Sequence, residues 1–334
     1  MQIITPQTRS DKGVTLIELL VVLVIAAVLV GGIYTLFMTQ QRSYSVQDQV
    51  TGVQQDARVA LTFMARDIRM AGMSVGAGSA AGFADDTPTP FSLSSFPLGD
   101  TFTYAVEPRN SASAPDTLTV VLGTEELGVV QSVDTVVTLD NLDNNASFLT
   151  AVTNGRAFVA FDLRVGKLYN VTSVDFAANQ ITLSNFSSGE KTVGGKVYWV
   201  KAITYTVTAP DGTPGLGVLR RNENIVDGAQ PLAGDGATTF VEDLQFAYQV
   251  DGDNINWYND PAGFPAGMTA ANISMVRINI TVRTAVQDAT VQDAAAAVQF
   301  NQPPLEDHTN PADLNGPDGF RRRVHQTVVK VRNI

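Results

Sequence analysis

The sequence KGVTLIELLVVLVIAAVLVGGIYTLFMTQQ, residues 12–41, decides the class of protein. From Leu19 to Gln41 it holds 23 consecutive uncharged residues, mostly Val, Leu, Ile, Ala and Gly. A helix needs about 20 apolar residues to cross the roughly 30 Å hydrocarbon core of a bilayer, so this run is long enough to span one. It is longer than the apolar core of a secretory signal peptide, about 7 to 15 residues, and no Ala-x-Ala cleavage site follows it. The sequence therefore predicts a membrane-spanning helix near the amino end.

The charges around this run predict its orientation. Arg9 and Lys12 precede it, and most of the chain follows it. By the positive-inside rule, the first residues lie in the cytoplasm and the residues after the span lie outside.

Glu18 interrupts the apolar pattern at the cytoplasmic start of the span. A carboxylate at the centre of a membrane helix costs on the order of 2.5–3.5 kcal/mol and normally has a partner. Two explanations remain open: a side chain that reaches the interface alone, or an ion pair with a positive charge of a neighbouring subunit. We favour the ion pair.

The segment KGVTLIE, residues 12–18, resembles the type IV prepilin signature. The resemblance implies that a prepilin peptidase cuts between Gly13 and Val14 and that the new N-terminus is methylated. It also implies that Glu18, then the fifth residue of the mature chain, neutralises the N-terminal amine of an adjacent subunit during assembly. Val14 stands where the family usually has Phe, but it is also hydrophobic, so cleavage is still expected.

Composition supports a folded protein and narrows the kinds of partner it could bind. The chain is 44% hydrophobic and 16% charged, which is typical of a domain with a packed core. Its formal net charge of −11 opposes general binding to nucleic acid, so such binding would need a local basic patch. The chain has no cysteine, which excludes disulfides, thiolate metal sites and cysteine nucleophiles.

An amphipathic helix is expected to continue the span. Apolar residues recur there at three- and four-residue steps, and Gly72 follows as a plausible C-cap. The stripe consists of Val46, Val50, Val53, Ala57, Leu61, Met64 and Ile68, with Asp67 among the polar residues mainly off it. The domain prediction is a cleaved leader at 1–13, a transmembrane helix at 14–38, its amphipathic continuation at 39–71 and a β-rich head at 72–334.

The head is predicted to be rich in antiparallel strands. Runs of β-branched and aromatic residues alternate with Gly, Asn and Asp turns, and no strand–helix–strand rhythm appears. The clean alternation of 273–283 and 324–331 predicts strands with one solvated face. The predicted strands are 117–122, 133–139, 157–163, 180–183, 196–207, 216–221, 241–250, 273–283 and 324–331. The fold class is α+β and pilin-like, with the long N-terminal helix packed on this head.

The carboxyl-terminal third resembles the PilW-like minor pilins. The resemblance rests on residues 241–248 with the Asp251-Gly252-Asp253 turn, residues 276–284, and the closing segment 321–333, which match in order and position. Type II secretion pseudopilin J has a similar plan and shares part of the pattern. The segment from about 72 to 200 is the least characteristic.

Several motifs invite a catalytic or metal-binding interpretation. Residues 72–76, GMSVG, match the G-x-S-x-G nucleophile elbow but follow a helix instead of a strand, so we do not expect catalysis. The two histidines, His308 and His325, stand alone. Two clusters of oxygen ligands suit either calcium or hairpin turns, and we favour turns. They are Asp251, Asp253, Asn254 and Asn256, and Asp313, Asn315 and Asp318.

Arg321, Arg322 and Arg323 form the one basic run. Contact with phosphate or DNA is one interpretation. A solvated edge strand, whose charges deter pairing with other strands, is the one we favour.

The sequence thus predicts a minor pilin without enzymatic activity, taking part in type IV pilus assembly at a priming or tip position. A secretion pseudopilin and a tip adhesin remain alternatives. The expected partners are prepilin peptidase, other minor and major pilins, and the assembly platform of the inner membrane. No cofactor, metal, small-molecule substrate or nucleic acid is expected. The expected location is the bacterial inner membrane, with the leader cytoplasmic and the head periplasmic, and then the pilus.

Overall fold

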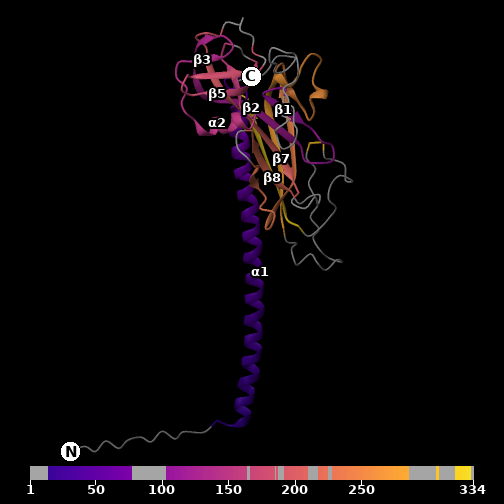
Figure 1. The fold of residues 1–334 in the computed structure, drawn as a ribbon. Coiled ribbons are helices and arrows are strands. Elements are labelled where there is room, and N and C mark those ends of the chain that lie inside the picture. Colours follow the sequence, from indigo (N-terminus) through magenta and orange to yellow (C-terminus); the bar gives the residue numbers. More distant parts are fainter. Residues whose placement is uncertain are drawn as a thin grey trace, which may run out of the picture. The chain divides into compact units, whose positions relative to one another are not determined.

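The computed structural model describes residues 14–76, 103–163, 166–184, 186, 192–209, 217–224, 228–285, 306, 307 and 320–331. Residues 1–49 and residues 50–334 form two compact units, and helix α1, Leu16–Arg69, runs from the first into the second. Two antiparallel sheets and a short helix make up the rest of the second unit (Figure 1).

Helix α1 ends where the sequence predicts. Its last residue is Arg69, and Gly72 has φ of 75°, the left-handed conformation that closes many helices. The Gly72 amide donates to Val121 O at 2.9 Å, and this hydrogen bond connects the end of the helix to the larger of the two sheets. Within the second unit, α1 buries one face, formed by Val53, Ala57, Ala60, Met64, Ala65, Asp67 and Ile68. Most of the predicted stripe is therefore confirmed.

The larger sheet has nine strands in the order β1-β2-β3-β6-β5-β4-β7-β8-β9. β2 and β7 also pair with each other, from Leu118↔Tyr205 to Val129↔Lys196. The strands β2, β3, β6, β5, β4 and β7 consequently close into a ring, a small antiparallel barrel. The strands are β1 Val106–Arg109, β2 Thr117–Val133, β3 Val137–Leu139, β4 Phe158–Phe161, β5 Leu168–Asp175, β6 Gln180–Leu183, β7 Lys196–Thr208, β8 Val218–Glu223 and β9 Gln230–Ala233.

The barrel has its own apolar core and one helix. Helix α2, Ala146–Thr153, starts at Asn145, whose side chain accepts hydrogen bonds from the amides of Ser147 and Phe148. The ring of Phe148 then meets Trp199 edge-on at 5.2 Å, and both are buried. All buried residues of this core lie between Leu127 and Trp199, so we call residues 124–199 the barrel lobe.

The smaller sheet packs against the buried face of α1. Its order is β11-β10-β12-β13, with β10 Thr239–Val250, β11 Asp253–Tyr258, β12 Ile273–Thr284 and β13 Arg322–Lys330. Two 3-10 turns, Pro261–Gly263 and Ala270–Asn272, connect β11 to β12. The segments that carry the PilW-like resemblance are the strands of this sheet and the β10–β11 turn. One core joins α1 to this sheet and to the nearer ends of β2, β7 and β8.

The α+β class is confirmed, with a long N-terminal helix followed by an antiparallel β-rich head. The solvated face predicted for β12 is wrong, because Asn279, Thr281 and Arg283 on that face are also buried. Glu306, in the β12–β13 connection, accepts hydrogen bonds from Arg277 and Asn279, whereas Arg283 lies over the ring of Phe320 at 3.9 Å. Strands β1, β5, β9 and β11 and helix α2 were not predicted from the sequence.

Candidate functional site

The amino end of α1 holds the residues singled out for processing and assembly. Gly13 lies outside the described residues, and Val14 is exposed. The Glu18 carboxylate turns back toward Thr15, where its Oε2 accepts from the Thr15 amide at 3.2 Å and from the Thr15 hydroxyl at 3.1 Å. The Glu18 amide donates to Thr15 Oγ1 at 3.3 Å. Thr15 and Glu18 thus form a capping box at the first turn of the helix.

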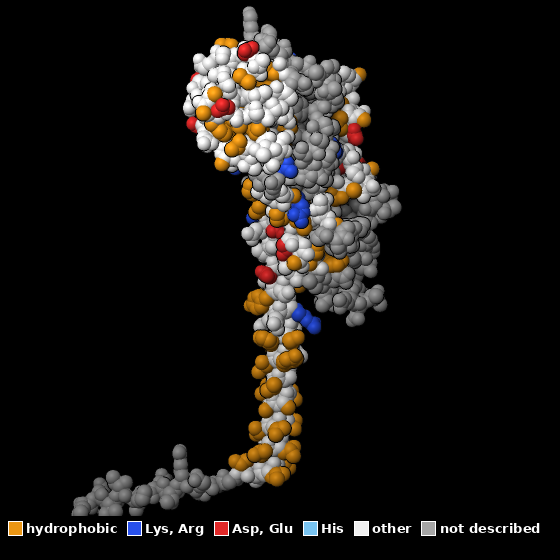
Figure 2. All heavy atoms as spheres, in the orientation of Figure 1, with side chains coloured by type: hydrophobic (Ala, Val, Ile, Leu, Met, Phe, Trp, Pro, Cys, Tyr) orange, Lys and Arg blue, Asp and Glu red, His pale blue; other side chains and the backbone are white. Residues whose placement is uncertain are grey.

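The rest of the first unit is a helix covered with apolar side chains. From Leu16 to Phe37, its large hydrophobic residues are exposed, for example Leu29 by 61% and Ile33 by 66% (Figure 2). Among the described residues, one helix, α1, is long and apolar enough to cross a membrane. A continuous apolar surface of this extent calls for lipid or other apolar helices as its surroundings.

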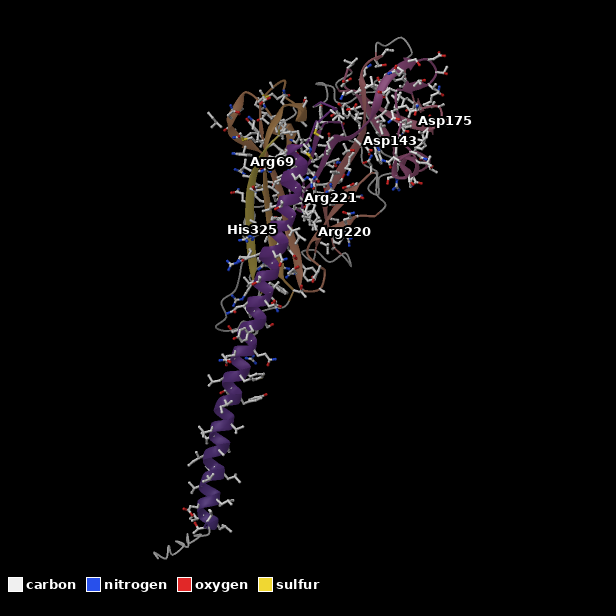
Figure 3. The ribbon with its side chains drawn as sticks, turned by 90° about the vertical axis from the view of Figure 1, so that its left-hand side faces the viewer. Arg69, Asp143, Asp175, Arg220, Arg221 and His325 are labelled. Carbon is white, nitrogen blue, oxygen red and sulfur yellow. The ribbon has the colours of Figure 1, made fainter. Side chains whose placement is uncertain are left out.

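A buried polar cluster fixes the last turns of α1 to the larger sheet. Asp67 accepts from the hydroxyl of Tyr205 at 2.5 Å and from Arg221 Nε at 2.8 Å, and all three side chains are largely buried. Figure 3 labels Arg221 next to α1. Glu223 pairs with Arg221 and, at 2.9 Å, with Lys201. Burial and the adjacent Asp67 carboxylate raise the pKa of Tyr205 well above its ordinary value, so its hydroxyl stays a donor. The sequence placed Asp67 off the buried stripe, and that placement is wrong.

The basic run at the start of β13 is divided between two environments. Arg322 is buried and binds Glu242 through two contacts, Nε–Oε2 at 2.5 Å and a terminal nitrogen to Oε1 at 2.9 Å. Arg323 is exposed. The three arginines line a cavity of about 160 Å³ with Val50, Val53 and Thr284. The prediction of a solvated arginine is therefore wrong for Arg322, whose guanidinium group pairs with Glu242 and is buried.

The oxygen-rich cluster near Asp253 forms a turn. Asp253 accepts hydrogen bonds from the amides of Ile255 and Asn256 and from the Tyr258 hydroxyl. The Tyr258 hydroxyl is the main cause that lowers the pKa of Asp253. The second cluster, Asp313, Asn315 and Asp318, lies outside the described residues, as does His308. Within the part of the chain that the structure describes, no three His, Cys, Asp or Glu side chains are placed to hold a metal ion.

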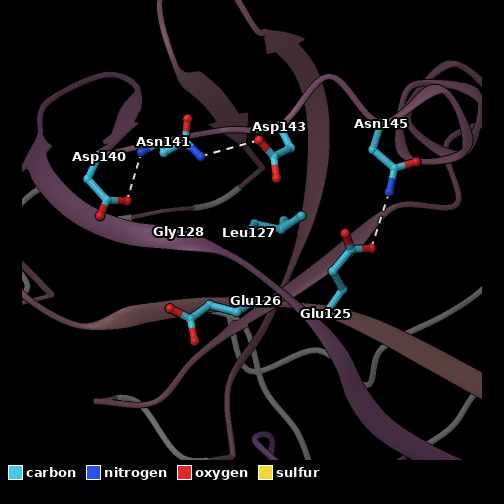
Figure 4. A pocket seen from close by; sticks show the side chains of 8 residues that line it. All are labelled: Glu125, Glu126, Leu127, Gly128, Asp140, Asn141, Asp143 and Asn145. Atoms are coloured by element: carbon cyan, nitrogen blue, oxygen red, sulfur yellow. Dashed lines mark hydrogen bonds between the residues drawn. The ribbon is translucent and has the colours of Figure 1, made fainter.

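A polar groove of about 220 Å³ crosses the surface of the barrel lobe (Figure 4). Its acidic residues are Glu125, Glu126, Asp140 and Asp143. Much of this charge organises the loop before α2: Asn145 donates to Glu125 at 3.2 Å, and Asn141 donates to Asp143 at 3.2 Å. Amide donors from Val129 and Asn141 lower the pKa of Asp140. No pattern in the sequence predicted this groove, whose residues meet because β2 and β3 pair as a hairpin, with Val130 opposite Leu139.

Within the described residues, the G-x-S-x-G match lies in a turn that follows a helix, not in a turn from a strand into a helix. Ser74 follows the end of α1, and the Gly76 amide donates to Gly72 O at 2.7 Å, which closes a tight turn. Ser74 has φ of 60°, and its Cβ lies against the backbone position of Gly123. His325 lies on β13, where burial, Arg58 and Arg323 lower its pKa.

Comparison with known proteins places one recognisable motif on this chain. Residues 8–34 match the model of the prokaryotic N-terminal methylation motif. The chain carries a prepilin-type amino end. No curated protein matches the chain as a whole. A solved structure of a type IV-like pilin from Thermus thermophilus aligns with 13% identity and a TM-score of 0.37, covering 84% of this chain and 97% of that one. The motif covers the first part of α1, the helix that is long and apolar enough to cross a membrane.

Proposed function

We propose that the protein is a minor subunit of a type IV pilus, processed by prepilin peptidase between Gly13 and Val14. The observation that carries the proposal is the methylation motif at residues 8–34, continued by a helix whose apolar side chains are exposed. In this proposal the mature subunit waits in the inner membrane with its head outside. It then moves sideways into a growing filament, where helix contacts replace lipid contacts.

The proposed role of Glu18 follows from its place in this helix. It is the one charged residue between Val14 and Gln41, so no oppositely charged residue lies within its own span. An unpaired carboxylate in the bilayer is costly, and the N-terminal amine of a neighbouring subunit is the cation that assembly would bring to it. A charge pair of this kind favours correctly registered neighbours over misplaced ones.

The size of the head supports a minor role. A bulk fibre subunit is repeated in a tight helical lattice, and each copy would have to accommodate the barrel lobe as well as the sheet that packs on α1. A subunit present in few copies, at a priming or tip position, avoids that steric demand. Other pilins and the assembly platform of the inner membrane are the partners this role implies.

The proposal is tested by replacing Glu18 in the full-length chain in its native host. We expect Glu18→Gln and Glu18→Ala to reduce filament number strongly while membrane levels of the processed protein stay unchanged. Normal filament number and length in both variants would contradict the assembly role. Co-purification provides the second arm: recovery of pilins supports the proposal, whereas recovery of secretion components alone would overturn it in favour of a pseudopilin.

A further inference from the structure

Strand β13 forms one margin of the smaller sheet, and its outer edge is open in the part of the chain that the structure describes. The sheet order β11-β10-β12-β13 gives it a single neighbour, β12. Figure 3 labels His325 on this strand. Native proteins commonly keep edge strands very short or cover them, whereas β13 has nine residues. An open edge of this length is a candidate interaction surface.

The hydrogen bonds at the two ends of β13 show which backbone groups face outward. Arg321 O accepts from the Thr284 amide at 3.0 Å, and the Val331 amide donates to Ser274 O at 2.9 Å. The register between these two bonds is continuous, and hydrogen-bonded pairs alternate along an antiparallel ladder. The odd-numbered residues of β13 therefore bond to β12. The even-numbered residues turn their amides and carbonyls toward the open edge.

The side chains of these even-numbered residues are exposed and partly apolar. Val324 is 40% exposed and Val328 is 47% exposed, and Gln326 between them is exposed as well. The three side chains share one face of the strand, because successive residues of a strand point to opposite faces. Two exposed valines beside outward backbone groups form a surface on which another strand can both pack and hydrogen-bond.

The charge of β13 is entirely positive. Arg323 and Lys330 are exposed, and the strand contains no Asp or Glu. A second copy of the chain suits this edge poorly. Two β13 strands paired antiparallel along their full length would place Arg322 of one copy opposite Lys330 of the other, and like charges directly opposite each other are destabilising. The complementary occupant is a strand that carries carboxylates.

We propose that the open edge of β13 binds an extended acidic segment of a partner protein, which adds to the smaller sheet as a fifth strand. Backbone hydrogen bonds to the even-numbered residues supply the affinity, and carboxylates beside Arg323 and Lys330 select the partner. The alternative role of edge charges, to deter pairing, predicts that no strand binds here. This inference goes beyond the proposed function and does not depend on it, because it concerns the second unit alone.

Peptides matched in length to β13 test the proposal on the full-length protein in detergent micelles. Val alternates with Glu in one nine-residue peptide and with Lys in the other. We expect the Glu peptide to bind at least about tenfold more tightly, measured by calorimetry, because its charge complements the edge. It should also slow hydrogen exchange at the amides of Val324, Gln326 and Val328, whereas the odd-numbered amides, already bonded to β12, change little. Equal binding of the two peptides, or unchanged exchange at the outward amides, would overturn the proposal.

Proline at an outward amide isolates the backbone contribution. Gln326→Pro removes a donor that faces the open edge and leaves the bonds to β12 in place, a position at which edge strands accept proline. We expect it to bind the Glu peptide about five- to tenfold more weakly, whereas Gln326→Thr, which keeps the amide, binds like the parent. Unchanged affinity of folded Gln326→Pro, verified by circular dichroism, contradicts strand addition. If Gln326→Pro does not fold, Lys330→Glu decides: it should lose the preference for the Glu peptide, and an unchanged preference contradicts the proposal.

A second copy of the chain is the rival occupant, and protein concentration distinguishes it. Slow exchange at the outward amides without peptide, increasing with protein concentration, would show that β13 pairs with another copy and would overturn the proposal of an acidic partner. None of these outcomes bears on the assembly role of Glu18, which is judged by filament formation in the native host.

Discussion

Single charged residues carry the most information in this chain, and they differ in how far the sequence explains them. Glu18 stands out in the sequence, because a single carboxylate in an apolar run is costly in a bilayer and normally has a partner. Asp67 gives no such signal: its partner Arg221 is 154 positions away and becomes a neighbour only in the folded unit. Local periodicity assigns such a residue to the solvent face. Its burial follows from a contact that no local pattern encodes.

Removing the Asp67 carboxylate should strongly destabilise residues 50–334. Arg221 would lose the carboxylate that its Nε binds at 2.8 Å while remaining mostly buried, and breaking a buried ion pair from one side costs about 3 kcal/mol or more. Urea unfolding of Asp67→Ala measures the loss. Tyr205→Phe, which removes a single hydrogen bond to the same carboxylate, should cost about 1.5 kcal/mol. A loss below about 0.5 kcal/mol for Asp67→Ala would show that the cluster contributes little.

Asp116 should make the stability of this unit depend on pH. Burial raises its pKa to about 7, and the carboxylates of Asp307 and Asp243 add to the effect against the amide donors of Phe246 and Ser111. A raised pKa means that the folded state binds the proton more tightly than the unfolded state. This contribution is therefore complete below about pH 4 and is lost as pH rises through about 7.

The corresponding measurement is the free energy of unfolding between pH 5 and pH 8. The parent unit should lose about 2 kcal/mol across this range relative to Asp116→Asn, which has no proton to release. His325 acts in the opposite direction, because its pKa is lowered in the folded state and its contribution to stability therefore rises with pH. Comparing the parent with Asp116→Asn cancels this contribution. Parallel pH profiles for the two proteins would rule out Asp116 as the source.

At the scale of elements, periodicity predicted the regular parts and failed where tertiary contacts dominate. The buried face of α1 follows three- and four-residue steps, and β6, Gln180–Leu183, begins and ends at the predicted residues. The missed strands β1 and β9 each contain a proline, Pro108 and Pro231, which argues against a strand. β12 alternates as an exposed strand would, yet Glu306 pairs with its polar face and buries it. Charge pairing across a long connection overrides the pattern.

The two faces of α1 should respond differently to added volume. Ala60 is fully buried in the core shared with the sheets, so Ala60→Leu should overpack it and cost about 1–3 kcal/mol. Val59, the adjacent residue, is 40% exposed, so Val59→Leu should change stability by less than about 0.5 kcal/mol. Thermal unfolding of both variants of residues 50–334 tests the assignment. Equal effects would mean that the buried face is wrongly placed.

At the scale of the whole molecule, the barrel lobe is the feature least accessible from sequence. Its closure depends on pairing β2 with β7, for example Val129 with Lys196, which are 67 positions apart in the sequence. Each strand alone is compatible with an open sheet, so no local signal distinguishes a barrel. The helix and the carboxyl-terminal strands, which the prepilin and PilW-like resemblances covered, form a core that contains none of the residues of the lobe.

The lobe meets the rest of the unit in a third cluster, where Phe158, Ala160 and Leu168 pack with Val75, Ala105 and Val121. The core around α1 contains none of these residues, so we predict that the lobe can be removed at the cost of this contact. Gly123 and Val200 are cross-strand partners, so a short turn can join them in place of residues 124–199. The core around α1 keeps all its residues, and the shortened unit should still unfold cooperatively in urea. Full-length protein with this deletion should also assemble into filaments, because the proposed assembly contacts lie on α1. If the shortened unit folds but filaments fail to form, the lobe itself takes part in assembly, and its polar groove becomes the first surface to mutate.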